Sequence, residues 1–163
     1  PFFARIYDSY ITVGFMLLVT GLMLHAISFL PRGARGIEEM RYADALFISF
    51  AQGIAIIPGI SRSGATITAA LARKLGIAAA VKFSFLMSIP AILGATVVEA
   101  KDLITDGLGE IHLIPYFAAA LFAFLAGVVA IKTFVRLLQA QKFNYFAYYC
   151  WFAGVFVIVT ALL

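Results

Sequence analysis

Four long apolar runs constrain this chain more than any other feature of its sequence. They cover residues 9–30, about 77–98, 114–135 and 144–163, and each is long enough for the roughly 20 helical residues that cross a bilayer. Of the 163 residues, 64% are hydrophobic and 12% are charged, about half the charged share of soluble domains. We therefore predict an all-α integral membrane protein, a single membrane domain over residues 1–163 with four transmembrane helices.

Residues 43–72 form another apolar segment, but PGISRSG interrupts it. The segment is too long for one crossing and too short for two crossings and a turn. Residues 43–57 and 64–72 are each typical of a helix, and proline beside glycine seldom continues one. Because broken backbone at membrane depth must be satisfied by protein or by a watery cavity, we predict a re-entrant helix–turn–helix hairpin with its tip buried in the bundle.

Charged residues in the connecting segments support this hairpin. The segments 31–42, 73–82 and 132–142 are basic, whereas 99–112 is acidic. A hairpin that enters and leaves on one side places the first two segments together, and the positive-inside rule puts them in the cytoplasm. The net charge of +4 is small and scattered, which does not indicate binding to nucleic acid.

The hairpin tip is rich in hydrogen-bond donors. A charged side chain at the bilayer centre costs about 2.5–3.5 kcal/mol. A protein tolerates this cost where the charged group meets a partner or a ligand. A guanidinium, hydroxyl groups and the free N–H groups of a restarting helix together favour an anion site. The candidate residues are Gly59, Ser61, Arg62, Ser63, Gly64 and Thr66. The alternative is a surface loop whose arginine reaches water.

A P-loop is a further interpretation of the tip, and we reject it. GISRSGAT at 59–66 nearly fits the Walker pattern, but Ala65 replaces the lysine and no soluble strand precedes it.

The nine residues PGISRSGAT resemble the PGxSRSxxT signature of the undecaprenyl-diphosphate phosphatases, the BacA-type bacitracin-resistance membrane enzymes. AQGIAIIPG before the signature, KFSFLMSIPAILGAT at 82–96 and AIKTF at 130–134 also resemble that family. The resemblance implies a bacterial inner-membrane protein built from two inverted repeats, each with a re-entrant hairpin. It implies phosphate release from undecaprenyl diphosphate, which recycles the lipid carrier of cell-wall (peptidoglycan) synthesis, with support from a divalent cation such as Mg or Ca.

The resemblance also assigns roles to the signature. Arg62 and Ser61 would be catalytic, with Arg62 gripping the diphosphate and stabilising charge on the transferred phosphoryl group. Ser61, Ser63 and Thr66 would hold phosphate oxygens, while Gly59 and Gly64 would let backbone approach them.

One part of the family pattern is missing from this sequence. The family has an (E/Q)xxxE motif, followed by a serine-rich turn and a histidine. The nearest match here is Gln52 with Ile56 four residues later, which lacks the second acidic residue. His25 is expected to be packed or interfacial, and His112 solvated. We therefore expect no metal ligands in this chain. We expect it to be the C-terminal half of such an enzyme, incomplete and inactive without its N-terminal repeat.

Two other functions stay open on the sequence alone. A transporter or flippase of a phosphorylated polyprenyl lipid also uses inverted repeats with broken helices, and an assembly subunit that needs another chain is the third reading. The small residues Ala119, Ala123 and Gly127 recur every four positions, which indicates close helix packing within the chain or, alternatively, a homodimer seam.

Overall fold

The computed structural model describes residues 9–31, 33–105, 113–140 and 142–163, and all regular elements in these ranges are helical. The elements are α2 (Tyr10–Ala26), the short 3-10 helix η1 (Ile27–Phe29), α3 (Tyr42–Ile54), α4 (Arg62–Ala72), α5 (Ile77–Thr105), α6 (Leu113–Gln139) and α7 (Phe143–Leu162). Within the described residues, four segments are long and apolar enough to cross a membrane: Tyr10–Phe29, Ile77–Lys101, Pro115–Gln139 and Phe143–Leu162. The prediction of an all-α, multi-pass membrane protein is confirmed.

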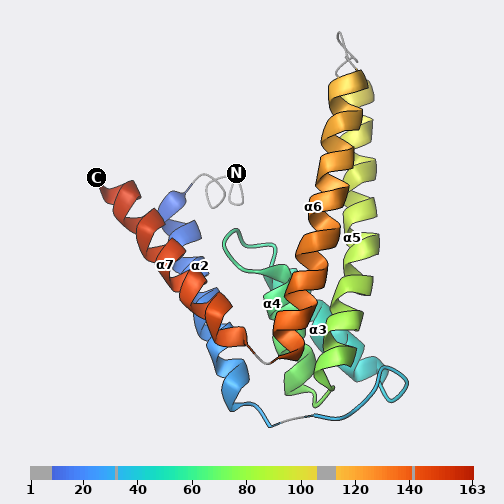
Figure 1. Ribbon diagram of the computed structural model, residues 1–163, viewed down its shortest axis with the longest axis vertical. Helices are drawn as coiled ribbons and strands as arrows, with labels where there is room; N and C mark the ends of the chain where they lie inside the picture. Colours follow the sequence, from blue (N-terminus) through green and yellow to red (C-terminus); the bar gives the residue numbers. More distant parts are fainter. Residues whose placement is uncertain (1–8, 32, 106–112, 141) are drawn as a thin grey trace.

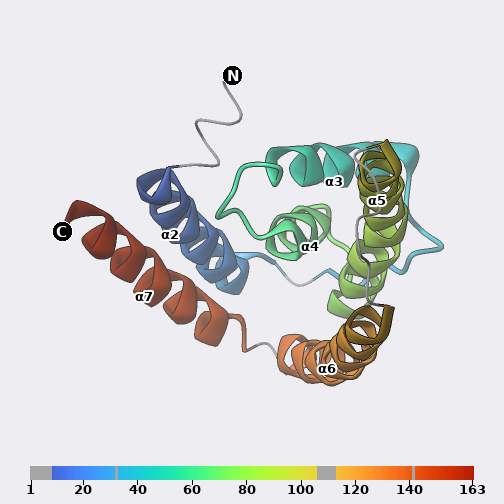
Figure 2. The ribbon, with the colours of Figure 1, turned by 90° about the horizontal axis from the view of Figure 1, so that it is seen from above.

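The helices form two pairs with the hairpin between them (Figure 1). Helices α2 and α7 lie side by side in one pair, α5 and α6 form the other, and the pairs diverge from one end of the molecule. Seen from above, α3 and α4 occupy the space between the pairs (Figure 2). The buried face of α4, which includes Ile67, Ala70 and Leu71, joins the hydrophobic core.

Close packing of α2 on α7 depends on glycine. A Cβ on Gly14 would lie 2.9 Å from the Gly154 carbonyl oxygen, and a Cβ on Gly154 would lie 2.8 Å from the Gly14 carbonyl oxygen. His25 of α2 also contacts α7, because its Nδ1 lies 3.1 Å from Asn144 Oδ1 and its ring packs on Trp151. The expectation of a packed histidine is confirmed.

A buried carboxylate holds the base of the hairpin, where α3 begins and α4 ends. Asp44 is fully buried and accepts hydrogen bonds from Arg35 Nη2 and Arg73 Nε, both at 2.7 Å, and from the Arg41 N–H at 3.0 Å. The Arg41 N–H and the two guanidinium groups hold the pKa of Asp44 well below its ordinary value. These contacts tie both ends of the hairpin to the segment that precedes it.

The basic segments around the hairpin lie at one end of the molecule, as the charge pattern predicted (Figure 1). The Gly76 N–H donates to the Arg35 carbonyl at 2.9 Å, which joins the segment before α3 to the segment after α4. Residues 106–112, which include His112 and part of the acidic segment, lie outside the described residues.

Two expectations need correction. The hairpin break is 55–61 rather than 58–63, because Ser61 caps α4 and Arg62 already belongs to its first turn. The expectation that the small residues Ala119, Ala123 and Gly127 of α6 pack within the chain is also wrong for the part of the chain that the structure describes. Ala119 and Ala123 are exposed, and a Cβ added to Gly127 would meet no heavy atom within 4 Å.

Candidate functional site

The break between α3 and α4 is docked against the middle of α2. Gly59 has φ +94°, and a Cβ there would lie 2.5 Å from the Val13 carbonyl oxygen and 2.7 Å from Met16 Cβ. Glycine is therefore required twice, by the left-handed backbone and by the close approach. Because Val13 and Met16 belong to a candidate membrane span, the hairpin tip lies alongside the interior of that span.

Thr20 of α2 fastens both sides of the turn. Its hydroxyl donates to the Gly59 carbonyl at 2.9 Å and accepts from the Ser61 N–H at 3.1 Å, and the residue is completely buried. Sequence reasoning missed Thr20. Its signal was slight, because Thr20 is one of several hydroxyl residues in a largely apolar run. Only the folded chain shows that the run and the turn meet there.

The first turn of α4 presents donors toward the break. Ser61 Oγ accepts from the Gly64 N–H at 3.1 Å and lies 3.5 Å from Ser63 Oγ. The N–H groups of Arg62 and Ser63 occupy the first two helical positions, where no carbonyl of the same helix can reach them. The positive end of the helix dipole adds to the attraction of this position for an anion.

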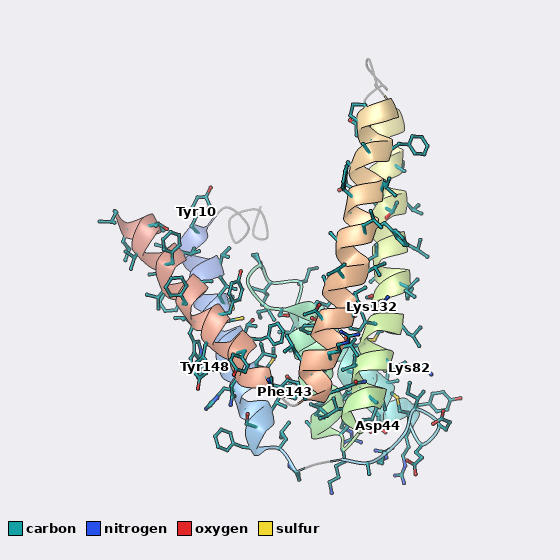
Figure 3. All side chains as sticks on the ribbon, in the orientation of Figure 1. Tyr10, Asp44, Lys82, Lys132, Phe143 and Tyr148 are labelled. Atoms are coloured by element: carbon teal, nitrogen blue, oxygen red, sulfur yellow. The ribbon has the colours of Figure 1, made fainter. Side chains whose placement is uncertain are left out.

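Arg62 is half-buried, and its guanidinium contacts no carboxylate or carbonyl in the described ranges. In contrast, the guanidinium groups of Arg35 and Arg73 both donate to Asp44. Asp44 lies at the base of the hairpin (Figure 3). The five donors of Arg62 are therefore available to an external acceptor such as a phosphate group.

The six predicted residues do not all meet. Gly59, Ser61, Arg62, Ser63 and Gly64 lie within the turn and the first turn of α4. Thr66 is 1% exposed, and its hydroxyl donates to the Arg62 carbonyl at 2.9 Å and lies 2.6 Å from Ser84 Oγ of α5. These bonds favour packing of α4 on α5, and contact between Thr66 and phosphate stays a prediction.

The described residues do not fit a divalent cation. No group of three or more His, Cys, Asp or Glu in the described ranges is placed to hold one, and both Asp44 oxygens are occupied by arginine. Gln52 Oε1 is buried without a hydrogen-bond partner, but a single amide oxygen falls far short of the coordination that Mg²⁺ or Ca²⁺ requires.

Comparison with known proteins identifies a matching family and several similar proteins. A family model described as bacitracin resistance protein BacA matches residues 1–156. An undecaprenyl-diphosphatase of Halothermothrix orenii is 45% identical over 160 residues, which are 98% of this chain and 62% of the relative. One from Alkaliphilus metalliredigens is 46% identical over 161 residues, 99% of this chain and 58% of the relative.

The chain spans about 60% of the length of those two relatives. A third undecaprenyl-diphosphatase, from Methanothermobacter thermautotrophicus, is 40% identical over 167 residues, which cover 99% of this chain and 90% of the relative. The match to the family model extends over nearly the whole sequence and includes the hairpin, its break, the first three candidate spans and the fourth as far as residue 156. The chain belongs to the bacitracin resistance protein BacA family.

Proposed function

We propose that this chain supplies the phosphate-binding part of a membrane phosphatase that hydrolyses undecaprenyl diphosphate to undecaprenyl phosphate and phosphate. The observation that carries the proposal is the start of α4. There Ser61, Arg62 and Ser63 follow one another beside the middle of a membrane span, and among the described residues the Arg62 guanidinium and two N–H groups have no partner. The names of the relatives support the choice of substrate.

The residues of the hairpin tip have separate tasks in this proposal. Arg62 grips the terminal phosphate and stabilises the charge that develops on its oxygens as the phosphoryl group is transferred. Ser61 and Ser63 hold phosphate oxygens, and Thr66 belongs to this set as a prediction. Water supplies the new oxygen on the terminal phosphorus, and the bond to the bridging oxygen breaks, so that undecaprenyl phosphate leaves.

The proposal also extends to a metal ion, to a second copy of the chain and to the membrane. Acidic ligands for a supporting Mg or Ca ion would come from an N-terminal repeat, and a homodimer is a further proposal for the exposed face of α6. The setting is the bacterial inner membrane, where the reaction would recycle the carrier for cell-wall synthesis.

The test is phosphate release from undecaprenyl diphosphate by the intact protein as its gene encodes it. Arg62→Ala should lower kcat by about 10²–10³-fold, the range found when a positioned donor is removed. Arg62→Lys should recover little, because a point charge cannot make the two-pronged contact. Arg136→Ala is the matched control, since that exposed arginine of α6 lies outside the break. Full activity in Arg62→Ala would overturn the assignment, and substrate binding without hydrolysis in the wild type would favour a transporter.

A further inference from the structure

Two cavities meet at the start of α4. The inner cavity, of about 350 Å³, lies between α2, the break, α4, α6 and α7, and its wall includes Leu17, Thr20, Ser61 and Cys150. The outer cavity, of about 480 Å³, is lined by Ser63 together with residues of α5, α6 and α7. Phe134 and Phe146 line both cavities, with their ring centroids 5.0 Å apart in an edge-to-face contact. This aromatic pair therefore forms a wall common to the two cavities.

The hydroxyl groups of Thr20 and Ser61 in the inner cavity already have hydrogen-bond partners within the chain. Thr20 is bonded to the Gly59 carbonyl and the Ser61 N–H, and Ser61 Oγ accepts from the Gly64 N–H. Most of the remaining lining is aliphatic or aromatic, from residues such as Leu24, Ile67 and Leu138. Apolar cavities of this kind stay dry and bind hydrocarbon rather than water or ions. The chemistry of the inner cavity therefore suits an apolar chain.

The serines connect the two cavities. Ser61 lines the inner cavity and Ser63 the outer one, yet their hydroxyl oxygens are 3.5 Å apart. A ligand with a charged head at the hairpin tip can therefore extend an attached apolar chain directly into the inner cavity. Tyr149, which also lines that cavity, is 68% exposed on α7, so the cavity reaches the surface that faces lipid.

We propose that the inner cavity holds the isoprenoid units next to the diphosphate, and that contact with Leu17 of α2, which lines it, selects substrates with a chain beyond the first unit. This inference rests on the proposed phosphatase function. A cavity of about 150 Å³ accommodates one benzene molecule, so 350 Å³ corresponds to about two five-carbon units. The rest of a long chain would remain in the bilayer.

The first experiment narrows the inner cavity and compares substrates. Leu17→Trp places bulk in the cavity, and Leu22→Trp is the matched control, because Leu22 is 60% exposed on the same helix and lines no part of the cavity. For undecaprenyl diphosphate, Leu17→Trp should raise KM about tenfold, which corresponds to about 1.4 kcal/mol of binding. The KM for dimethylallyl diphosphate, with a single unit, should stay at the wild-type value.

The outcomes separate the two proposals. If the wild type releases no phosphate from undecaprenyl diphosphate, the proposed function fails and this inference fails with it. A second case is an active wild type in which Leu17→Trp has the same KM values as Leu22→Trp, or in which Leu17→Trp raises the KM for both substrates by the same factor. In that case only the cavity assignment is overturned.

A second measurement uses the unmodified protein and avoids any risk of misfolding. Cys150, the free cysteine of α7, lines the inner cavity and can report its occupancy through the rate of reaction with N-ethylmaleimide. Farnesyl diphosphate should slow the reaction, and inorganic pyrophosphate should not. Equal protection by farnesol, which lacks the phosphates, would show a cavity for any lipid tail and would overturn the inference.

Discussion

Replacing Gly59 with alanine should disrupt the hairpin tip through two separate costs. The backbone at Gly59 has φ +94°, and an L-residue in a left-handed conformation costs about 1–2 kcal/mol. The new Cβ would also lie 2.5 Å from the Val13 carbonyl oxygen and 2.7 Å from Met16 Cβ. The neighbours must move, and such overpacking costs about 1–3 kcal/mol. Together these terms predict a loss of about 2–5 kcal/mol.

The assay is thermal unfolding of the purified protein in detergent. At about 2–4 °C per kcal/mol for a chain of this size, Gly59→Ala should lower the midpoint by roughly 4–20 °C. Gly53→Ala is the matched control, because Gly53 lies six residues earlier in α3 and a Cβ there would meet nothing within 4 Å. That change should leave stability unchanged or raise it by up to about 1 kcal/mol. Equal midpoints for the two variants would refute the docking of the turn on α2.

Two other predictions concern the groups that hold the hairpin. Thr20→Val should lower the free energy of unfolding by about 1–3 kcal/mol, because the Ser61 N–H loses its acceptor, and it should also slow phosphate release. The control is Thr160→Val, which removes an exposed hydroxyl that bonds to carbonyl groups of its own helix. It should change neither stability nor phosphate release. Asp44→Asn should lower the unfolding midpoint at neutral pH. Since the pKa of Asp44 is lowered on folding, its stabilisation is present above the unfolded value of about 3.9 and is lost as pH falls through the folded value. The difference between wild type and Asp44→Asn should therefore narrow only below about pH 4; a constant difference down to pH 2 would contradict the ion-pair account.

Much of the architecture could be predicted from local sequence pattern. The spans follow from the length of apolar runs, and the hairpin follows from Pro58 and Gly59 in a segment too short for two crossings. The basic segments before and after the hairpin were predicted to lie at the same end of the molecule, because a hairpin enters and leaves on one side. The boundary at Arg62 was missed because a serine cap and a continued break have similar local sequences.

Contacts between distant segments could not be predicted in this way. Thr20 meets Gly59 across 39 residues, and Asp44 meets Arg73 across 29. Neither pair leaves a periodic signal in the sequence. Nothing in the sequence separates the hydroxyl of Thr66 from the serine hydroxyls of the signature. Only the packing of α4 on α5 reveals its bond to Ser84. Sequence therefore indicated candidate groups for the chemistry, while tertiary packing determines the contacts that each one makes.

The central claim is that the start of α4, directly after the break, binds phosphate through Arg62. The most direct measurement is calorimetric titration of inorganic pyrophosphate into the intact protein in detergent, compared among wild type, Arg62→Ala and Arg136→Ala. The account predicts that wild type and Arg136→Ala bind with the same affinity, whereas Arg62→Ala loses about 10-fold or more, since a hydrogen bond to a charged group contributes about 1.5–3 kcal/mol. Unchanged pyrophosphate affinity in Arg62→Ala would contradict it.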